Sequence, residues 1–160
     1  MGMIFTTFDS PLGLMRLCSD GNALTAVTFA GQKYEHDHIP KDAVSDACPV
    51  LEQAKLWLHQ YFSGNIPNDF PPMNPTGTYF QQRVWEQLLQ IPYGETVTYG
   101  ELAKRMECKS AQAIGGAVGR NPISVLIPCH RVVGADGKLT GYAGGVEKKE
   151  FLLKLEKDHL

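Results

Sequence analysis

One short segment of the sequence combines a nucleophile with a base. An apolar run over 123–127 leads through Pro128 into Cys129, His130 and Arg131. A cysteine reacts as its thiolate, so it needs a base or a positive charge close by. The segment therefore predicts a reactive thiol at Cys129 that is activated by nearby basic groups.

The spacing of thiol and base limits how they interact. Adjacent residues face different ways on a helix or a strand, so contact between Cys129 and His130 needs a sharp turn or a bridging water. A base also needs a group that orients its ring. Glu156 is a candidate, because in a predicted helix over Glu147–Lys157 it shares the apolar face of Leu152, an unusual position for a carboxylate.

The other cysteines and a histidine cluster have simpler interpretations. Cys18 and Cys48 lack basic neighbours in the sequence and are interpreted as small buried residues, and Cys108 as a solvated thiol in a turn. Two histidines and a carboxylate over 36–38 lack further well-spaced ligands, so we expect no metal site.

The composition is that of a globular protein, with 160 residues of which 43% are hydrophobic and 20% charged. The four cysteines are irregularly spaced, no apolar run is long enough to cross a bilayer, and no signal peptide is apparent. We therefore expect reduced thiols, no membrane association and a cytoplasmic location.

The distribution of charge differs between the two halves. A net charge of −2 excludes a polybasic protein. Residues 1–75 hold 4 cationic and 8 acidic residues, whereas residues 76–160 hold 11 and 9. The second half is therefore the better candidate for binding a polyanion.

Turn signals divide the first 62 residues into three short strands and a helix. We predict strands over Ile4–Phe8, Gly13–Cys18 and Leu24–Ala30, and the turn residues between them favour an antiparallel meander. Apolar residues at helical spacing then predict a helix over Val50–Phe62.

A proline-rich segment separates this part from the rest of the chain. Ser63–Thr78 holds four of the ten prolines, so it is predicted to be a linker between domains. The predicted domains are therefore residues 1–62 and residues 79–160, joined by residues 63–78.

The second domain is predicted to be mainly helical. A helix begins at Tyr79 with Thr78 as its N-cap. Thr98 and Glu101 match a capping box, so a second helix starts there and runs to about Met106. A third helix fits Ser110–Val118, and two short helices joined by a tight turn indicate a helix-turn-helix.

Together these motifs resemble the O6-alkylguanine-DNA alkyltransferases, DNA-repair proteins that react once. The likeness covers Phe80–Trp85, Tyr93–Tyr99, Gly119–Pro122, Pro128–Arg131, Gly141–Gly145 and Leu152–Glu156, and extends more weakly to Asp9–Gly13. The resemblance implies a two-domain α/β (α+β) fold: a ribonuclease-H-like N-terminal domain and a helical C-terminal domain with the helix-turn-helix.

The resemblance implies an activity and a role for each site residue. The protein would transfer an alkyl group from O6 of guanine in DNA to Cys129 in a single displacement, without a cofactor. His130 would remove the thiol proton through a water, and Glu156 would hold His130. Tyr99 would donate a hydrogen bond to N3 of the guanine. Asn121 and Arg131 would be structural supports, with Asn121 tying down the active-site loop.

The partner that the resemblance implies is double-stranded DNA containing O6-alkylguanine, bound by a monomer through the minor groove. The base must leave the helical stack to reach Cys129. The helix over Ser110–Val118, with its small side chains, would enter the groove. The residues assigned to substrate or DNA binding are Gln112, Ala113, Arg120, Arg131, Tyr142, Ala143 and Gly144.

The sequence departs from the family's pattern at Gln112. The family places an arginine here, which fills the gap left by the flipped base. Glutamine carries no charge and reaches less far, so we predict weaker DNA binding or a slower reaction than with arginine. Lys104, Lys109 and Arg120 are candidates for phosphate contacts instead, or are ordinary solvated charges.

Three other functions would use the same residues. A Cys–His hydrolase or acyltransferase would turn over and need an oxyanion hole. A lesion-binding relative would flip the base without repairing it, but such relatives lack the acceptor cysteine. A redox-sensing thiol would need a resolving cysteine, and none lies near Cys129 in the sequence. The sequence does not say whether O4-alkylthymine is also a substrate.

Overall fold

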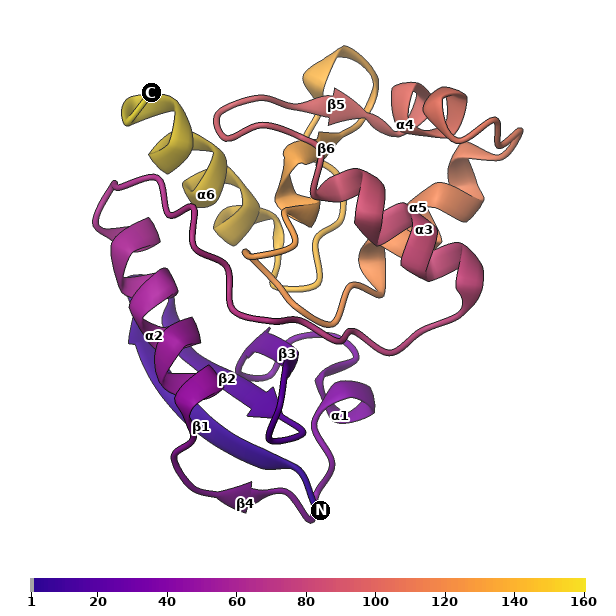
Figure 1. The fold of residues 1–160 in the computed structure, drawn as a ribbon. Coiled ribbons are helices and arrows are strands. Elements are labelled where there is room, and N and C mark those ends of the chain that lie inside the picture. The colour runs from indigo at the N-terminus through magenta and orange to yellow at the C-terminus, as the bar shows by residue number, and fades with distance from the viewer. Residues whose placement is uncertain (1) are drawn as a thin grey trace. The chain divides into compact units, whose positions relative to one another are not determined.

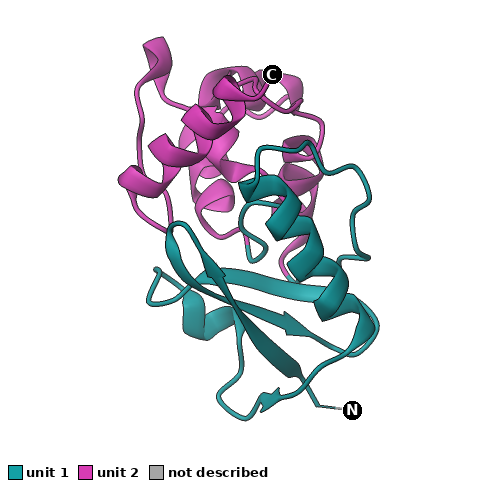
Figure 2. Ribbon diagram, turned by 90° about the vertical axis from the view of Figure 1, so that its left-hand side faces the viewer, with its two compact units in different colours: residues 1–76, 122–126 teal, residues 77–121, 127–160 magenta. Residues whose placement is uncertain are grey.

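The computed structural model describes residues 2–160 (Figure 1). The chain divides into two compact units (Figure 2). Unit 1 comprises the residues up to 76 together with 122–126, and unit 2 comprises 77–121 together with 127–160. Within the described residues, no helix is both long enough and apolar enough to cross a membrane.

Unit 1 is built on a four-stranded sheet with the order β3-β2-β1-β4. β1 (Ile4–Ser10), β2 (Gly13–Ser19) and β3 (Leu24–Phe29) form an antiparallel meander, which confirms the predicted strands to within two residues. β4 (Val44–Ser45) pairs in parallel with β1 and was not predicted, because two residues carry no readable periodicity.

One helix covers the sheet of unit 1 and closes its core. α2 (Pro49–Phe62) contacts β1, β2 and β3. The face predicted to be apolar is buried, and it comprises Leu51, Ala54, Leu58 and Tyr61. Trp57 stacks on Tyr61 with ring centroids 5.5 Å apart. A further short helix, α1 (Glu35–His38), was not predicted.

The outer edge of β3 is covered by two segments from elsewhere in the chain. Leu24 pairs with residues 72–74 and Val27 with residues 122–124, through backbone hydrogen bonds of 2.8 to 2.9 Å. An uncovered strand edge presents unpaired N–H and C=O groups. Residues 72–74 of the proline-rich segment therefore protect the edge of the sheet in unit 1.

The helices of unit 2 follow the sequence prediction closely. They are α3 (Tyr79–Leu88), α4 (Tyr99–Arg105), α5 (Ala111–Gly119) and α6 (Val146–Asp158). Both halves of a capping box are present at Thr98 and Glu101, and Thr78 caps α3 in the same way with Gln81. Ser110 caps α5 by accepting the backbone N–H of Ala113 at 3.0 Å.

A two-stranded parallel ladder, which was not predicted, joins two distant parts of unit 2. β5 (Val97–Thr98) pairs with β6 (Val132–Val133). β5 leads directly into α4, and β6 directly follows a single 3-10 turn over Cys129–Arg131. The ladder therefore brings the start of α4 beside the residues predicted to be reactive.

Candidate active site

Cys129 is the first residue of the 3-10 turn, and the residue is 5% exposed. Burial raises the pKa of this thiol, while a hydrogen bond from Asn121 and the charge of Lys149 act in the opposite direction. The backbone N–H groups of Cys129 and His130 also favour the thiolate. Cys129 is thus protonated at rest, in surroundings prepared to accept its negative charge.

Asn121 holds the loop that ends at this thiol. Its side-chain Nδ2 donates to the carbonyl oxygen of Ile127 at 2.8 Å, within the buried interior. The same residue hydrogen-bonds to the thiol of Cys129. Asn121 therefore fixes the position of the sulfur and contributes to its electrostatics.

His130 is fully buried and its ring is oriented by Glu156. Its Nε2 lies 2.5 Å from Oε2 of Glu156. Burial lowers the pKa of His130, although the hydrogen bond and charge of Glu156 oppose that effect. We therefore assign a neutral ring that donates through Nε2–H to Glu156 and carries its basic lone pair on Nδ1.

Glu156 is fully buried on α6, as its place on the apolar face predicted. Arg131 donates to its two oxygens from Nε at 2.8 Å and from Nη2 at 3.1 Å, and the backbone N–H of Gly94 adds a bond of 3.0 Å. Burial alone would raise the pKa of Glu156, but His130 and Arg131 outweigh it and set the value at about 2. The carboxylate is therefore ionised at every physiological pH.

Arg131 connects this carboxylate to the loop before β5. Its Nη1 donates to the carbonyl oxygen of Ile91 at 2.8 Å, and its guanidinium lies 5.6 Å from the centre of the Tyr93 ring. The side chain is 11% exposed. These contacts make Arg131 a support for Glu156 and the active-site loop; the sequence had also assigned it to DNA binding.

Tyr99 is the first residue of α4, where the β5–β6 ladder places it near Cys129. Burial raises the pKa of its phenol, and the charge of Cys129 raises it further. Its hydroxyl lies 3.4 Å from Oγ1 of Thr140. A Cβ added to Gly115 on α5 would lie 3.8 Å from the ring of Tyr99. The ring of Tyr99 thus lies beside Gly115 of α5, and its phenol is close enough to Cys129 for the two groups to interact electrostatically.

Lys149 is a site residue that the sequence analysis missed. It is fully buried on α6, and its Nζ donates to the carbonyl oxygen of Thr140 at 3.2 Å and lies 5.8 Å from the centre of the Tyr99 ring. Burial lowers its pKa, while the negative charge available at Cys129 raises it. A readable signal existed: Lys149 lies three residues before Leu152 and seven before Glu156, on the same helical face.

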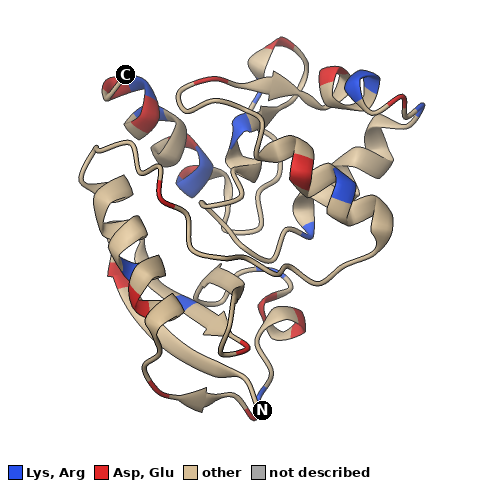
Figure 3. Cartoon of the chain, in the orientation of Figure 1, with Lys and Arg blue, Asp and Glu red and all other residues tan. Residues whose placement is uncertain are grey.

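α5 presents an exposed surface of small side chains. Ile114, Ala117 and Val118 are buried, whereas Ala111, Gln112, Ala113 and Gly116 are exposed. A Cβ added to Gly116 would meet nothing within 4 Å, so tight packing against another helix is not the reason for the small residues on this face. The helix carries no Lys, Arg, Asp or Glu and is drawn entirely in tan in Figure 3.

The remaining predicted residues lie around this surface and on the loop before α6. Lys104, Lys109 and Arg120 are exposed on the segments that flank α5. Tyr142, Ala143 and Gly144 are half-buried, and the N–H of Gly145 closes their loop by donating to the carbonyl oxygen of Tyr142 at 2.8 Å.

Comparisons with known proteins define the class of this fold and site. Residues 3–73 match the ribonuclease-like domain, and residues 79–158 the DNA-binding domain, of 6-O-methylguanine DNA methyltransferase. The match covers nearly all of the chain. The protein therefore belongs to the 6-O-methylguanine DNA methyltransferase family, and the expected two-domain α/β (α+β) fold is confirmed.

Individual relatives agree over almost their full length. The methylated-DNA–protein-cysteine methyltransferase of Haemophilus influenzae is 45% identical over 157 residues, which cover 97% of this chain and 87% of the relative. That of Methanosarcina acetivorans is 44% identical, with 96% and 98% covered. A crystal structure of Mycobacterium tuberculosis OGT in complex with DNA has a TM-score of 0.89 and 41% identity, covering 98% of this chain and 94% of that one.

Proposed function

We propose that the protein repairs DNA by transferring an alkyl group from O6 of guanine to Cys129, once per molecule. The observation that carries the proposal is the buried thiol of Cys129, which directly precedes the buried His130–Glu156 pair and lies in the same unit as an exposed helix of small side chains. The names of the relatives, which describe methyl transfer from DNA to a protein cysteine, support the same conclusion.

The reaction begins with the thiol proton. His130 takes the proton from Cys129 through a water, and the imidazolium that forms is stabilised by Glu156, which is already ionised. The new thiolate is stabilised by Asn121, by two backbone N–H groups and by the ammonium of Lys149. The resulting ion pairs lie out of bulk water, where each interaction is stronger.

Alkyl transfer then follows as a single displacement. The thiolate forms a bond from sulfur to the alkyl carbon, and the bond from that carbon to O6 breaks. The electron pair passes into the guanine ring, where Tyr99 stabilises it by donating a hydrogen bond to N3. The product is a thioether, which offers no leaving group under these conditions, so the protein is consumed.

DNA recognition is assigned to the exposed face of α5. We propose that the small residues around Gly116 allow close approach to the minor groove of a duplex, with Gln112 occupying the place of the flipped base. Ala113 and Arg120 lie beside it, and the loop over 142–144 closes on the base. The minor groove distinguishes base pairs poorly, so a protein that binds there recognises the damage and the shape of the duplex more than its sequence.

The same proposal includes the remaining organisation of the protein. We propose domains over 1–62 and 79–160 joined by residues 63–78, of which 72–74 also pair with β3. We also propose a monomer as the active form, no cofactor and a cytoplasmic location. DNA as the partner is supported by the DNA complex of the M. tuberculosis relative.

A titration of product against DNA tests the function. An oligonucleotide duplex containing O6-methylguanine is added in increasing excess over the protein, and restored guanine is measured after long incubation. The proposal predicts a plateau at one equivalent of guanine per active molecule. Continued product formation would indicate a turning-over hydrolase instead, and binding without any restored guanine would indicate a lesion-binding protein.

A further inference from the structure

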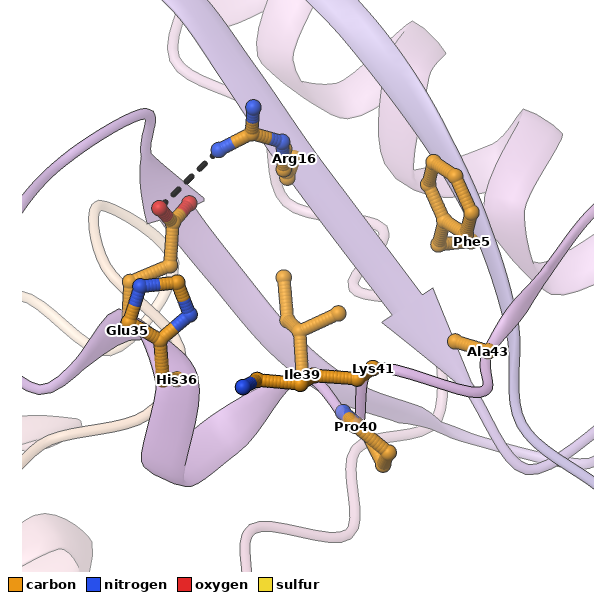
Figure 4. Close-up of a pocket in the computed structure, with 8 residues that line it drawn as sticks. All are labelled: Phe5, Arg16, Glu35, His36, Ile39, Pro40, Lys41 and Ala43. Atoms are coloured by element: carbon orange, nitrogen blue, oxygen red, sulfur yellow. Dashed lines mark hydrogen bonds and ion pairs between the residues drawn. The ribbon is translucent and has the colours of Figure 1, made fainter.

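Unit 1 contains a pocket that has no part in the chemistry at Cys129. Its volume is about 290 Å³, and all the residues that line it belong to unit 1 (Figure 4). It lies between β1, β2, α1 and the segment that leads to β4. This volume is near the lower end of the range for ligand pockets, so a ligand would be small.

The two ends of the pocket differ in chemistry. In Figure 4, polar groups from Arg16, Glu35 and His36 gather at one end, whereas Phe5 and Ala43 line the other. Such a combination of an apolar wall with a few convergent polar groups is typical of sites for small molecules.

The charge of the polar end is positive. Glu35 is 5% exposed and its charge is already met by Nη1 of Arg16 at 2.9 Å, the hydroxyl of Thr28 at 2.7 Å and the N–H of Gly31 at 2.9 Å. Within the described residues, Arg16 contacts Glu35 through Nη1 alone. Its Nε and Nη2 groups can therefore donate to a ligand. Lys41 adds a second cation to the pocket.

This positive end is exceptional for its surroundings. Residues 1–75 hold only 4 cationic residues against 8 acidic ones, yet this one pocket is lined by two of those cations, Arg16 and Lys41, and by a single acid, Glu35. An acidic unit repels anions in general, so a local cluster of this kind selects for an anion that fits the pocket.

We propose that the pocket binds a small organic anion, a carboxylate attached to a compact aromatic group. The carboxylate pairs with the free edge of the Arg16 guanidinium and with Lys41, and the ring lies against Phe5 and Ile39. A planar guanidinium fork suits a carboxylate, and burial of an aromatic ring supplies the apolar part of the affinity.

Binding of 4-fluorobenzoate to the full chain, followed by ¹⁹F NMR, tests the proposal. A ligand of this size in an open pocket is expected to bind with a Kd of about 1 mM. 4-Fluorobenzyl alcohol, which lacks the charge, and acetate, which lacks the ring, should each compete about tenfold more weakly.

Two variants locate the binding. Lys41→Gln removes a cation and should weaken binding about three- to tenfold, and Ala43→Leu fills the apolar end and should weaken it further. Lys55→Gln makes the same change of charge on α2, outside the pocket, and should have no effect. The proposal is overturned if 4-fluorobenzoate shows no saturation at about 10 mM, if acetate binds equally well, or if neither pocket variant changes the affinity.

Discussion

At the residue scale, the proposed chemistry depends on Glu156, a carboxylate that acts through His130 and not on the reacting atoms themselves. Glu156 accepts hydrogen bonds from His130, from Arg131 and from the backbone of Gly94, all in the interior of unit 2. It thereby orients the base and holds three segments of chain together. Replacing Glu156 should therefore lower both the stability of the fold and the rate of alkyl transfer.

The first prediction concerns Glu156→Gln. The change removes the carboxylate that pairs with the largely buried Arg131 and with the fully buried His130, so the free energy of unfolding should fall by about 3 kcal/mol. Guanidinium chloride unfolding measures the loss. Glu147→Gln, an exposed carboxylate on the same helix, serves as the control and should change stability little. Equal effects of the two changes would contradict the role given to Glu156.

The second prediction concerns Lys149→Met, which preserves length and removes the cation. Because the ammonium stabilises the thiolate of Cys129, single-turnover alkyl transfer should slow by about tenfold at neutral pH. The rate should recover as the pH rises, since a higher pH ionises the thiol without the lysine. Lys157→Met, at an exposed position of α6, should react at the original rate. A slow rate that is independent of pH would indicate a purely structural role for Lys149.

At the scale of elements, α5 combines a buried apolar face with an exposed face of small residues. Its capping by Ser110 and its burial through Ile114 fix the helix, so the exposed face is available for another function. Two substitutions on this face test two roles separately. One tests whether α5 must approach the duplex closely, and the other tests whether residue 112 fills the place of the flipped base.

The third prediction concerns Gly116→Leu. Nothing lies within 4 Å of an added Cβ, so the variant should fold normally. A leucine would keep the duplex at a distance, and DNA affinity should fall by about tenfold, measured by fluorescence anisotropy with a labelled duplex. Gly116→Ala should have a smaller effect in the same direction. Undiminished affinity for the leucine variant would remove α5 from the DNA interface.

The fourth prediction concerns Gln112→Arg. An arginine at this position adds a cation and a longer reach, so it should strengthen DNA binding and steepen the dependence of log Kd on log salt by about one unit. Gln90→Arg adds the same charge at an exposed position outside α5 and should leave the salt dependence unchanged. If Gln112→Arg alters neither DNA affinity nor reaction rate, then the glutamine at this position weakens neither DNA binding nor alkyl transfer.

Elements with local signals were predictable from the sequence, and elements created by long-range pairing were not. Capping residues and apolar spacing located α3, α4, α5 and α6. The β5–β6 ladder has two residues in each strand and depends on partners 35 residues apart, so it leaves no local pattern. Glu156 was found because a carboxylate on an apolar face is conspicuous, and the same argument applied to Lys149 would have found it.

At the scale of the whole molecule, the buried site makes stability depend on pH. His130 is held neutral in the folded state, since burial lowers its pKa, whereas an unfolded chain binds a proton near the ordinary value. The stability associated with neutral His130 is fully present above the pKa that the residue has in the unfolded chain. It is lost as the pH falls from that value through the lower pKa of the folded state. Glu156, with a folded pKa of about 2, adds stability that is lost at still lower pH.

The fifth prediction follows from this linkage. The melting temperature should fall as the pH is lowered from about 7 to 5, because the unfolded state takes up a proton that native His130 does not. In His130→Gln the melting temperature should depend less steeply on pH over this range, because unfolding of this variant takes up as much as one proton fewer. A melting temperature with the same slope in both proteins would contradict a buried neutral histidine.

The central claim is that Cys129 itself receives the alkyl group, and isotopic mapping tests it most directly. The protein is incubated with a duplex containing O6-(trideuteromethyl)guanine, digested, and each of its four cysteine peptides is examined by mass spectrometry. We expect one trideuteromethyl group, found only on the peptide with Cys129, and none in Cys129→Ala. Label on Cys108 or Cys18, or full transfer by Cys129→Ala, would contradict it.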